Sequence, residues 1–213
     1  MIVLQEQYPA KATPLEWAIK WRQPFSLAVI LACAILLLAT PPTWMHESTT
    51  GRLLDTIGLL LVVIASLGRT WCSLYISGYK EHRIVCEGPY AIVRNPLYLF
   101  SFVGALGLGL ATMHLAILAI IAMAFILYYP LVVWAEEFNL LQIFGQEYER
   151  YQNQVPRFIP RRLTMVEPDT YPVRPRHVRR SMQQNVWFFW AYLLLEIVPI
   201  IQGNGWILSH FSF

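Results

Sequence analysis

The sequence predicts an all-α fold, a polytopic membrane helical bundle of about five transmembrane helices in which the third and fourth spans form a tight hairpin. Of the 213 residues, 56% are hydrophobic and only 14% are charged, which is too apolar for a water-soluble globule. Four regions also contain apolar runs near the roughly 20 residues that cross a bilayer as a helix. We therefore expect a single membrane domain over residues 1–213.

The first two spans are predicted over residues 25–44 and 53–75. Pro24 precedes the first span at a position typical of a helix start. Residues 1–24 mix charges with tryptophans and are expected to lie at the membrane interface. The second span contains Arg69 near its cytoplasmic end, and this arginine either extends to the membrane surface or faces a polar cavity.

The third apolar region, residues 97–134, has 38 residues without Asp, Glu, Lys or Arg. At 1.5 Å per residue, one helix of that length would be about 57 Å long, nearly twice the thickness of the hydrocarbon layer. We therefore predict two antiparallel spans that turn near Thr112, Met113 and His114. Both ends of such a hairpin lie on the same side of the membrane.

The last span is predicted over residues 186–206, after a cytoplasmic segment of residues 135–185. Lys and Arg accumulate in cytoplasmic loops. The N-terminal segment, the loop before the hairpin and residues 135–185 together hold fourteen of the sixteen Lys and Arg. This distribution predicts an integral membrane protein with a cytoplasmic N-terminus and its C-terminus outside. No transit-peptide pattern precedes the first span, which favours a bacterial inner membrane.

The two ends of the hairpin carry its most unusual polar groups. Arg94 and Asn95 precede one end, and Glu136 and Glu137 follow the other. Antiparallel spans bring these two pairs within reach of each other, and a cation beside an anion at the end of a bundle suits a zwitterionic small molecule. Taken singly, Arg94 is also typical of a cytoplasmic anchor, and the two acids are typical of a solvated helix end.

Two motifs flank this hairpin. The first joins a turn to a polar and aromatic stretch, at Gly88, Pro89, Tyr90, Arg94, Asn95, Pro96, Leu97 and Tyr98. The second starts at the paired acids, at Glu136, Glu137, Leu140, Phe144, Gly145, Gln146, Glu147, Tyr148, Glu149, Arg150, Tyr151, Val155, Pro156 and Pro160. Together they resemble the signatures of the isoprenylcysteine carboxyl methyltransferase and phospholipid methyltransferase group, over about residues 53–162.

The resemblance implies a membrane-embedded methyltransferase that uses S-adenosyl-L-methionine and methylates a carboxylate, thiol or amine of a lipophilic acceptor at the cytoplasmic face. It implies that Arg94, Asn95 and Glu137 are catalytic. It implies a cofactor site at the helix ends formed by Gly88, Pro89, Tyr90, Arg94, Asn95, Pro96, Tyr98, Glu136 and Glu137. We expect Arg69 and Tyr148 to bind the acceptor, and we expect no metal.

Two positions depart from the family pattern, and they keep alternatives open. Asn95 replaces the usual His, and an amide does not titrate near neutral pH. Phe100 replaces a small residue. A non-catalytic membrane scaffold or transporter subunit with the same fold is therefore a second hypothesis, and a membrane reductase that uses NADPH is a third.

The expected partners are a lipophilic or lipid substrate and the membrane lipids. The arginines within residues 174–180 directly precede a span, where basic residues bind anionic headgroups, so we do not expect nucleic acid. The oligomeric state stays open.

Overall fold

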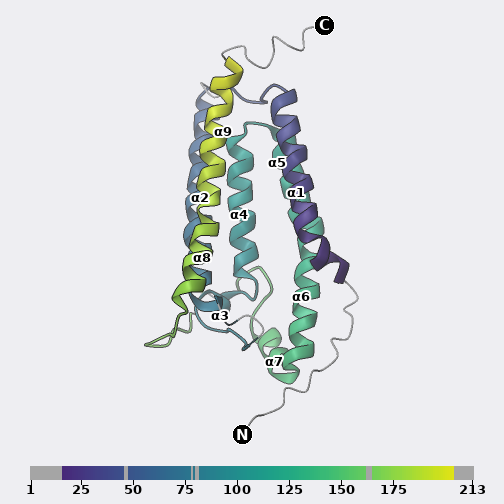
Figure 1. The fold of residues 1–213 in the computed structure, drawn as a ribbon, viewed down its shortest axis with the longest axis vertical. Helices are drawn as coiled ribbons and strands as arrows, with labels where there is room; N and C mark the ends of the chain where they lie inside the picture. Colours follow the sequence, from purple (N-terminus) through teal and green to yellow (C-terminus); the bar gives the residue numbers. More distant parts are fainter. Residues whose placement is uncertain (1–15, 46–47, 78, 80–81, 162–164, 204–213) are drawn as a thin grey trace.

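The computed structural model describes residues 16–45, 48–77, 79, 82–161 and 165–203. Over these residues the chain is helical and contains no strand, which confirms the predicted all-α bundle (Figure 1). The elements are α1 (Glu16–Ala39), α2 (Thr49–Ile76), α3 (Pro89–Ile92), α4 (Pro96–Ala111), α5 (Leu115–Met123), the π-helical turn η1 (Ala124–Tyr128), α6 (Tyr129–Phe144), α7 (Gln146–Gln154), α8 (Pro175–Asn185) and α9 (Trp187–Gly203).

Three helical stretches in the described part of the chain are long and apolar enough to cross a membrane. They are Glu16–Ala39, Thr49–Ile76 and the continuous stretch Leu115–Phe144. Helix α4 is a shorter apolar helix, and α9 has 17 described residues. The predicted last span extends to residue 206, so its end lies outside the described residues.

The hairpin is present where the sequence predicts it. Helix α4 begins at Pro96 and ends at Ala111, and α5 begins at Leu115. Met113 in the turn is fully buried and has a positive φ of 57°. Its carbonyl oxygen accepts hydrogen bonds from the backbone nitrogens of Thr43 (2.8 Å) and Trp44 (3.3 Å). The turn is therefore attached to the segment that follows α1.

Several helix boundaries differ from the prediction. Helix α1 ends at Ala39, whereas the first span was expected to end near residue 44, and α2 begins at Thr49, whereas the second span was expected to begin at residue 53. Two larger differences extend helices into polar sequence. Helix α1 begins at Glu16 and contains Pro24, whereas the first span was expected to begin at residue 25. Helix α6 continues to Phe144, ten residues past the predicted end of the hairpin. In both places the polar extension of the helix has a partner, because Arg22 of α1 binds Glu136 of α6.

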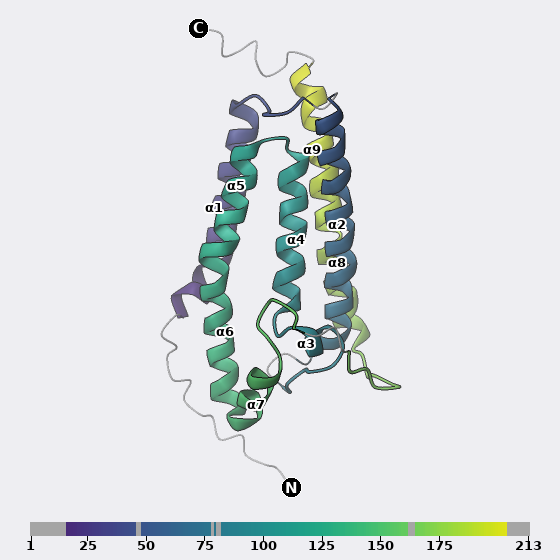
Figure 2. The same ribbon diagram turned by 180° about the vertical axis from the view of Figure 1, so that it is seen from behind.

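Helices α2 and α4 pack along each other, with α9 beside them (Figure 2). Small residues permit this close approach. A Cβ atom on Gly107 would lie 2.6 Å from the carbonyl oxygen of Gly58, and a Cβ on Gly104 would lie 2.5 Å from the ring of Phe188 in α9. Replacing either glycine would force these helices apart.

Helix α1 packs against α5 and α6 on the other side of the bundle. The rings of Phe25 and Tyr128 stack with centroids 3.9 Å apart. The π-helical turn ends at Tyr128, two residues before Pro130. Proline has no N–H to donate to the residue four positions earlier, so the regular hydrogen-bond ladder is interrupted there.

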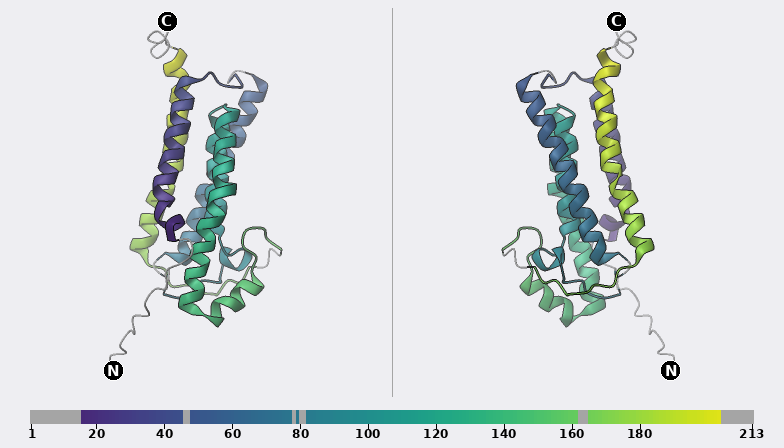
Figure 3. Two further views of the ribbon diagram at one scale, coloured as in Figure 1. Left: turned by 90° about the vertical axis from the view of Figure 1, so that its right-hand side faces the viewer. Right: turned by 90° about the vertical axis from the view of Figure 1, so that its left-hand side faces the viewer.

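The short helix α3 and helix α7 lie together at one end of the bundle, and α9 ends at the other (Figure 3). Residues 82–88 and 93–95, on either side of α3, and residues 155–161, which follow α7, gather at this same end. It is the end at which the start of α4 meets the end of α6, as the hairpin prediction requires.

Candidate functional site

Four side chains form what we call the Glu137 cluster: Glu137, Arg94, Asn95 and Arg157. The Glu137 carboxylate is 2% exposed and is bound by two guanidinium groups. Arg94 binds it in bidentate fashion, with Nε 3.1 Å from Oε1 and Nη2 3.1 Å from Oε2. Arg157 donates to Oε2 from Nε (3.0 Å) and Nη2 (2.7 Å), and Asn95 Nδ2 donates to Oε1 (2.7 Å). Two cations against one anion give the cluster a net positive charge.

The local sequence explains why Arg94 and Asn95 point toward α6. The proline ring disfavours the helical region for the residue before it, and Asn95 precedes Pro96 with φ −123° and ψ 53°. The chain therefore enters α4 through a non-helical link. The backbone nitrogens of Arg94 and Asn95 donate to the carbonyl oxygens of Pro156 (2.8 Å) and Arg157 (3.3 Å).

Arg94 also holds the segment after α7. Its Nη1 donates to the carbonyl oxygens of Gln152 (2.7 Å) and Val155 (3.0 Å). The Glu137 cluster thus joins the start of α4, the end of α6 and residues 152–157. The predicted approach of Arg94 and Asn95 to Glu137 is confirmed.

The neighbouring acid, Glu136, pairs with a different arginine. Its Oε1 lies 2.9 Å from Arg22 Nη1, which also donates to the hydroxyl of Tyr98 (2.8 Å). Adjacent residues on an α-helix point about 100° apart, so the two acids reach different partners. The expectation that both acids meet Arg94 and Asn95 therefore holds for Glu137, whereas Glu136 faces α1 and Tyr98.

The Gly-Pro-Tyr turn begins with a conformation that favours glycine. Gly88 has φ 58°, and a Cβ atom there would lie 2.4 Å from the ring of Tyr75. Pro89 is buried at the first position of α3. Tyr90 is 4% exposed and packs with Cys72, and its hydroxyl has no hydrogen-bond partner. Burial raises the pKa of Tyr90 well above its usual value, so this hydroxyl stays protonated.

The two residues expected to bind the acceptor lie in different surroundings. Arg69 faces the interior of the bundle, where Nε donates to Oδ1 of Asn185 (2.9 Å) and Nη1 donates to Oγ of Ser101. Tyr148 in α7 is 3% exposed and packs against Tyr151, with ring centroids 5.8 Å apart. The sequence left two positions open for Arg69, at the membrane surface or facing a polar cavity. In the structure Arg69 faces polar groups inside the bundle.

Sequence reasoning missed three residues of these networks. Arg157 was counted only as one of the basic residues of the cytoplasmic segment, although it directly follows Val155 and Pro156 of the second motif. Arg22 and Asn185 carried no signal, because their partners are at least 76 positions away in the chain. Within the described residues, no three or more His, Cys, Asp or Glu gather where they would hold a metal ion.

The chain is similar to known proteins over the region that contains the hairpin and the paired acids. The profile of the family described as phospholipid methyltransferase matches residues 48–147, which include the hairpin and both acids. The nickel-cobalt-cadmium resistance protein NccN of Alcaligenes xylosoxydans xylosoxydans is 34% identical over 84% of each chain. The cobalt-zinc-cadmium resistance protein CzcN of Cupriavidus metallidurans is 38% identical over 76% of this chain and 73% of that protein.

Similarity extends to enzymes over a shorter stretch. The protein-S-isoprenylcysteine O-methyltransferase of Schizosaccharomyces pombe is 32% identical over 38% of this chain and 34% of that protein. No solved structure matches the chain. With its apolar helices, its two motifs joined at Glu137 and these relatives, the chain is an integral membrane protein that belongs to the phospholipid methyltransferase family of membrane methyltransferases.

Proposed function

We propose that this protein transfers a methyl group from S-adenosyl-L-methionine to a lipophilic acceptor at the cytoplasmic face of a bacterial inner membrane. The observation that carries the proposal is the Glu137 cluster, in which Arg94 and Asn95 of the first motif bind Glu137 of the second. The family to which the chain belongs and its partial similarity to isoprenylcysteine O-methyltransferases support the reaction class.

The residues present suit a cofactor that carries a carboxylate. The surplus positive charge of the Glu137 cluster attracts an anion, and the Arg157 side chain is 38% exposed, so it remains accessible. The unpartnered Tyr90 hydroxyl is a second free donor at this end of the bundle. S-adenosyl-L-methionine would supply a methyl group already activated on a sulfonium, so the protein contributes mainly alignment and exclusion of water.

The acceptor decides whether a base is required. A carboxylate or thiolate acceptor needs no base, and an amine must lose a proton to become nucleophilic. Glu137 is poorly suited to take that proton, because its two oxygens already accept five hydrogen bonds from Arg94, Asn95 and Arg157. Glu136 has an 18% exposed side chain and is the better candidate. We assign Glu137 and Asn95 the role of holding the site in shape.

The resistance proteins among the relatives suggest a physiological setting. NccN and CzcN are named for resistance to nickel, cobalt, zinc and cadmium. We propose that this chain contributes to metal resistance through its methyl transfer. A host that carries Arg94→Gln, which we expect to lose methyl transfer, would then be as sensitive to cadmium as a host without the gene. Normal cadmium resistance in that host would show that resistance does not depend on methyl transfer.

The direct test uses purified protein, methyl-labelled S-adenosyl-L-methionine and a total lipid extract of the host, followed by chromatography of the label. We expect a labelled lipid with the wild type, and a loss of at least about a hundredfold with Arg94→Gln, which removes the bidentate contact to Glu137. Glu149→Gln, an exposed position in α7, is the matched control and should retain full activity.

A negative result has a defined meaning. If wild-type protein binds the cofactor but labels no lipid, soluble thiols and carboxylic acids are tested next. If none of these is methylated, the proposal fails and a non-catalytic scaffold or transporter subunit is favoured. Asn95 in place of the usual His would then mark the loss of chemistry.

A further inference from the structure

Arg69 differs from the other arginines that lie inside the described structure. Arg22, Arg83, Arg94 and Arg157 are each at least partly buried, and each forms an ion pair with a carboxylate. Among the ion pairs of the described residues, Arg69 has none. A cation inside a membrane protein without a counter-charge is costly, and such residues typically mark a binding site.

The groups around Arg69 orient its guanidinium without neutralising it. Ser101 Oγ of α4 and Asn185 Oδ1 at the end of α8 accept its hydrogen bonds, and the ring of Phe188 lies 5.6 Å from its Cζ. Asn185 is 3% exposed, and its Nδ2 donates to Oγ1 of Thr70 (3.0 Å), so its oxygen is directed at Arg69. Three helices therefore hold the cation in a fixed position.

A second unused donor lies close by. The hydroxyl of Tyr90 is buried and has no hydrogen-bond partner, and Tyr90 and Arg69 are near enough to interact electrostatically. Cys72 of α2 lies one turn from Arg69 and packs directly against Tyr90. The guanidinium of Arg69 on α2 and the protonated hydroxyl of Tyr90 on α3, which packs against the same part of α2, together suit a carboxylate or phosphate oxygen.

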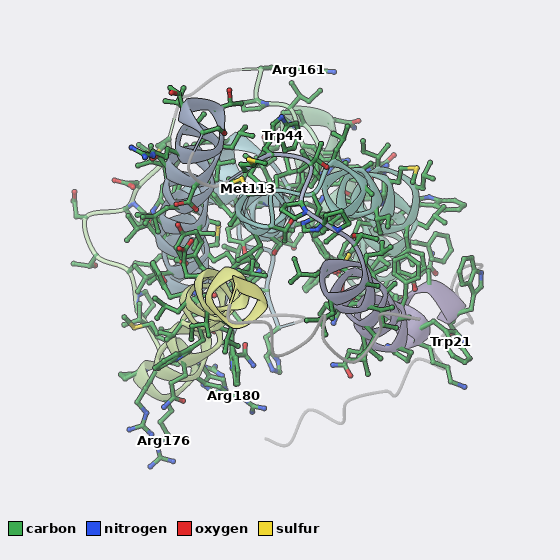
Figure 4. All side chains as sticks on the ribbon, turned by 90° about the horizontal axis from the view of Figure 1, so that it is seen from above. Trp21, Trp44, Met113, Arg161, Arg176 and Arg180 are labelled. Atoms are coloured by element: carbon green, nitrogen blue, oxygen red, sulfur yellow. The ribbon has the colours of Figure 1, made fainter. Side chains whose placement is uncertain are left out.

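The surface next to Arg69 has the character of a membrane interface. Helix α8 contacts α2, and Arg176, Arg179 and Arg180 on α8 are exposed. Arg176 and Arg180 point away from the bundle (Figure 4). Trp187 at the start of α9 is 69% exposed, as expected for an aromatic residue at headgroup level. Such a basic helix attracts anionic lipids.

We propose that Arg69 and Tyr90 bind the anionic headgroup, a carboxylate or a phosphate, of an amphiphilic lipid that is attracted to the membrane surface by α8. The proposal rests on the proposed function, because that lipid would be the methyl acceptor. The proposal narrows the acceptor to an acidic amphiphile. The anionic group of this lipid is bound by residues other than those of the Glu137 cluster.

The test measures binding of defined probes to the purified full chain in detergent micelles: phosphatidic acid, oleate, phosphatidylcholine, inorganic phosphate and S-adenosyl-L-methionine. For Arg69→Gln we expect phosphatidic acid and oleate to bind about tenfold more weakly or worse, because the charge-assisted contact is lost. Arg69→Lys, which keeps the charge, should recover most of the affinity. Arg52→Gln, an exposed arginine on the same helix, should bind both probes like the wild type.

The other probes identify the source of the anion. Inorganic phosphate that binds the wild type as tightly as phosphatidic acid does would overturn a lipid site. So would equal affinity of wild type and Arg69→Gln for phosphatidic acid and oleate. A loss of S-adenosyl-L-methionine binding in Arg69→Gln would assign the anion to the cofactor carboxylate and would also overturn the lipid site. Lipid labelling by the wild type reports on the methyl transfer itself, so failure of the proposed function is distinguishable from failure of this site.

Discussion

Arg94 and Arg69 both lie inside the same end of the bundle, but their surroundings differ. The Arg94 side chain is 10% exposed, and it binds the Glu137 carboxylate and two backbone carbonyl oxygens. Arg69 contacts a hydroxyl, an amide and an aromatic ring. The first arginine is paired with a carboxylate of the protein, whereas the second is positioned by neutral groups.

This difference separates two uses of a buried cation. Around Arg94 the charges join parts of the chain that lie far apart in the sequence, so they specify the shape of the site. Around Arg69 the neutral partners leave the charge available to a ligand. We therefore expect substitutions in the Glu137 cluster to affect folding and activity together, and substitution of Arg69 to affect binding without affecting folding.

The largest effect is expected for Glu137→Ala. This change leaves the buried Arg94 and the partly exposed Arg157 without their carboxylate, and breaking a buried pair such as Arg94–Glu137 costs about 3–5 kcal/mol. The free energy of unfolding in detergent, measured by titration with a denaturing detergent, should fall by that amount, and methyl transfer should be lost. Glu149→Ala in exposed α7 is the control. A Glu137→Ala protein as stable as the wild type would contradict the role given to the cluster.

A smaller loss of stability is expected for Gly107→Val. The added Cβ would meet the carbonyl oxygen of Gly58 at 2.6 Å, so α2 and α4 would have to separate, at about 1–3 kcal/mol for overpacking. Because Arg69 of α2 binds Ser101 of α4, the change should also weaken binding of phosphatidic acid. The free energy of unfolding and the affinity for phosphatidic acid can both be measured on one preparation. Unchanged stability would mean that these helices do not need the close contact.

Arg69→Gln provides the contrast with Glu137→Ala. Removing an uncompensated charge while keeping a hydrogen-bonding side chain should change the free energy of unfolding by less than about 1 kcal/mol. The same denaturation measurement checks this. A loss as large as that of Glu137→Ala would show that Arg69 is part of the structural network, and the comparison between the two arginines would fail.

The smallest effect concerns Cys86, which lies in the loop before Gly88. Partial burial and the charge of Glu87 raise the pKa of its thiol. The thiolate is the reactive form, so alkylation should be slow near neutral pH and should accelerate as the pH rises toward the raised pKa. Maleimide applied to inside-out vesicles should label Cys86, and the same reagent applied to intact cells should not. Labelling of intact cells would reverse the predicted topology and place both arginines on the outer side.

Much of the fold was predictable because the bilayer fixes helix length. The long uncharged region had to fold back on itself, and its turn lies at Met113 as expected. The approach of Arg94 to the paired acids followed from that hairpin. Which of the two acids would bind Arg94 was not predictable, because the rotation of α6 about its axis decides which acid faces α1 and which faces Arg94. Arg157 and Asn185 reach the networks through loops whose paths no local pattern describes.

Whether this membrane bundle binds S-adenosyl-L-methionine can be measured by calorimetric titration of the wild-type protein. S-adenosyl-L-methionine and NADPH are titrated into the same preparation in detergent. We expect saturable binding of S-adenosyl-L-methionine, at least about tenfold tighter than that of NADPH, and weaker binding of S-adenosyl-L-methionine by Arg94→Gln. Tighter binding of NADPH, or no binding of S-adenosyl-L-methionine, would contradict it.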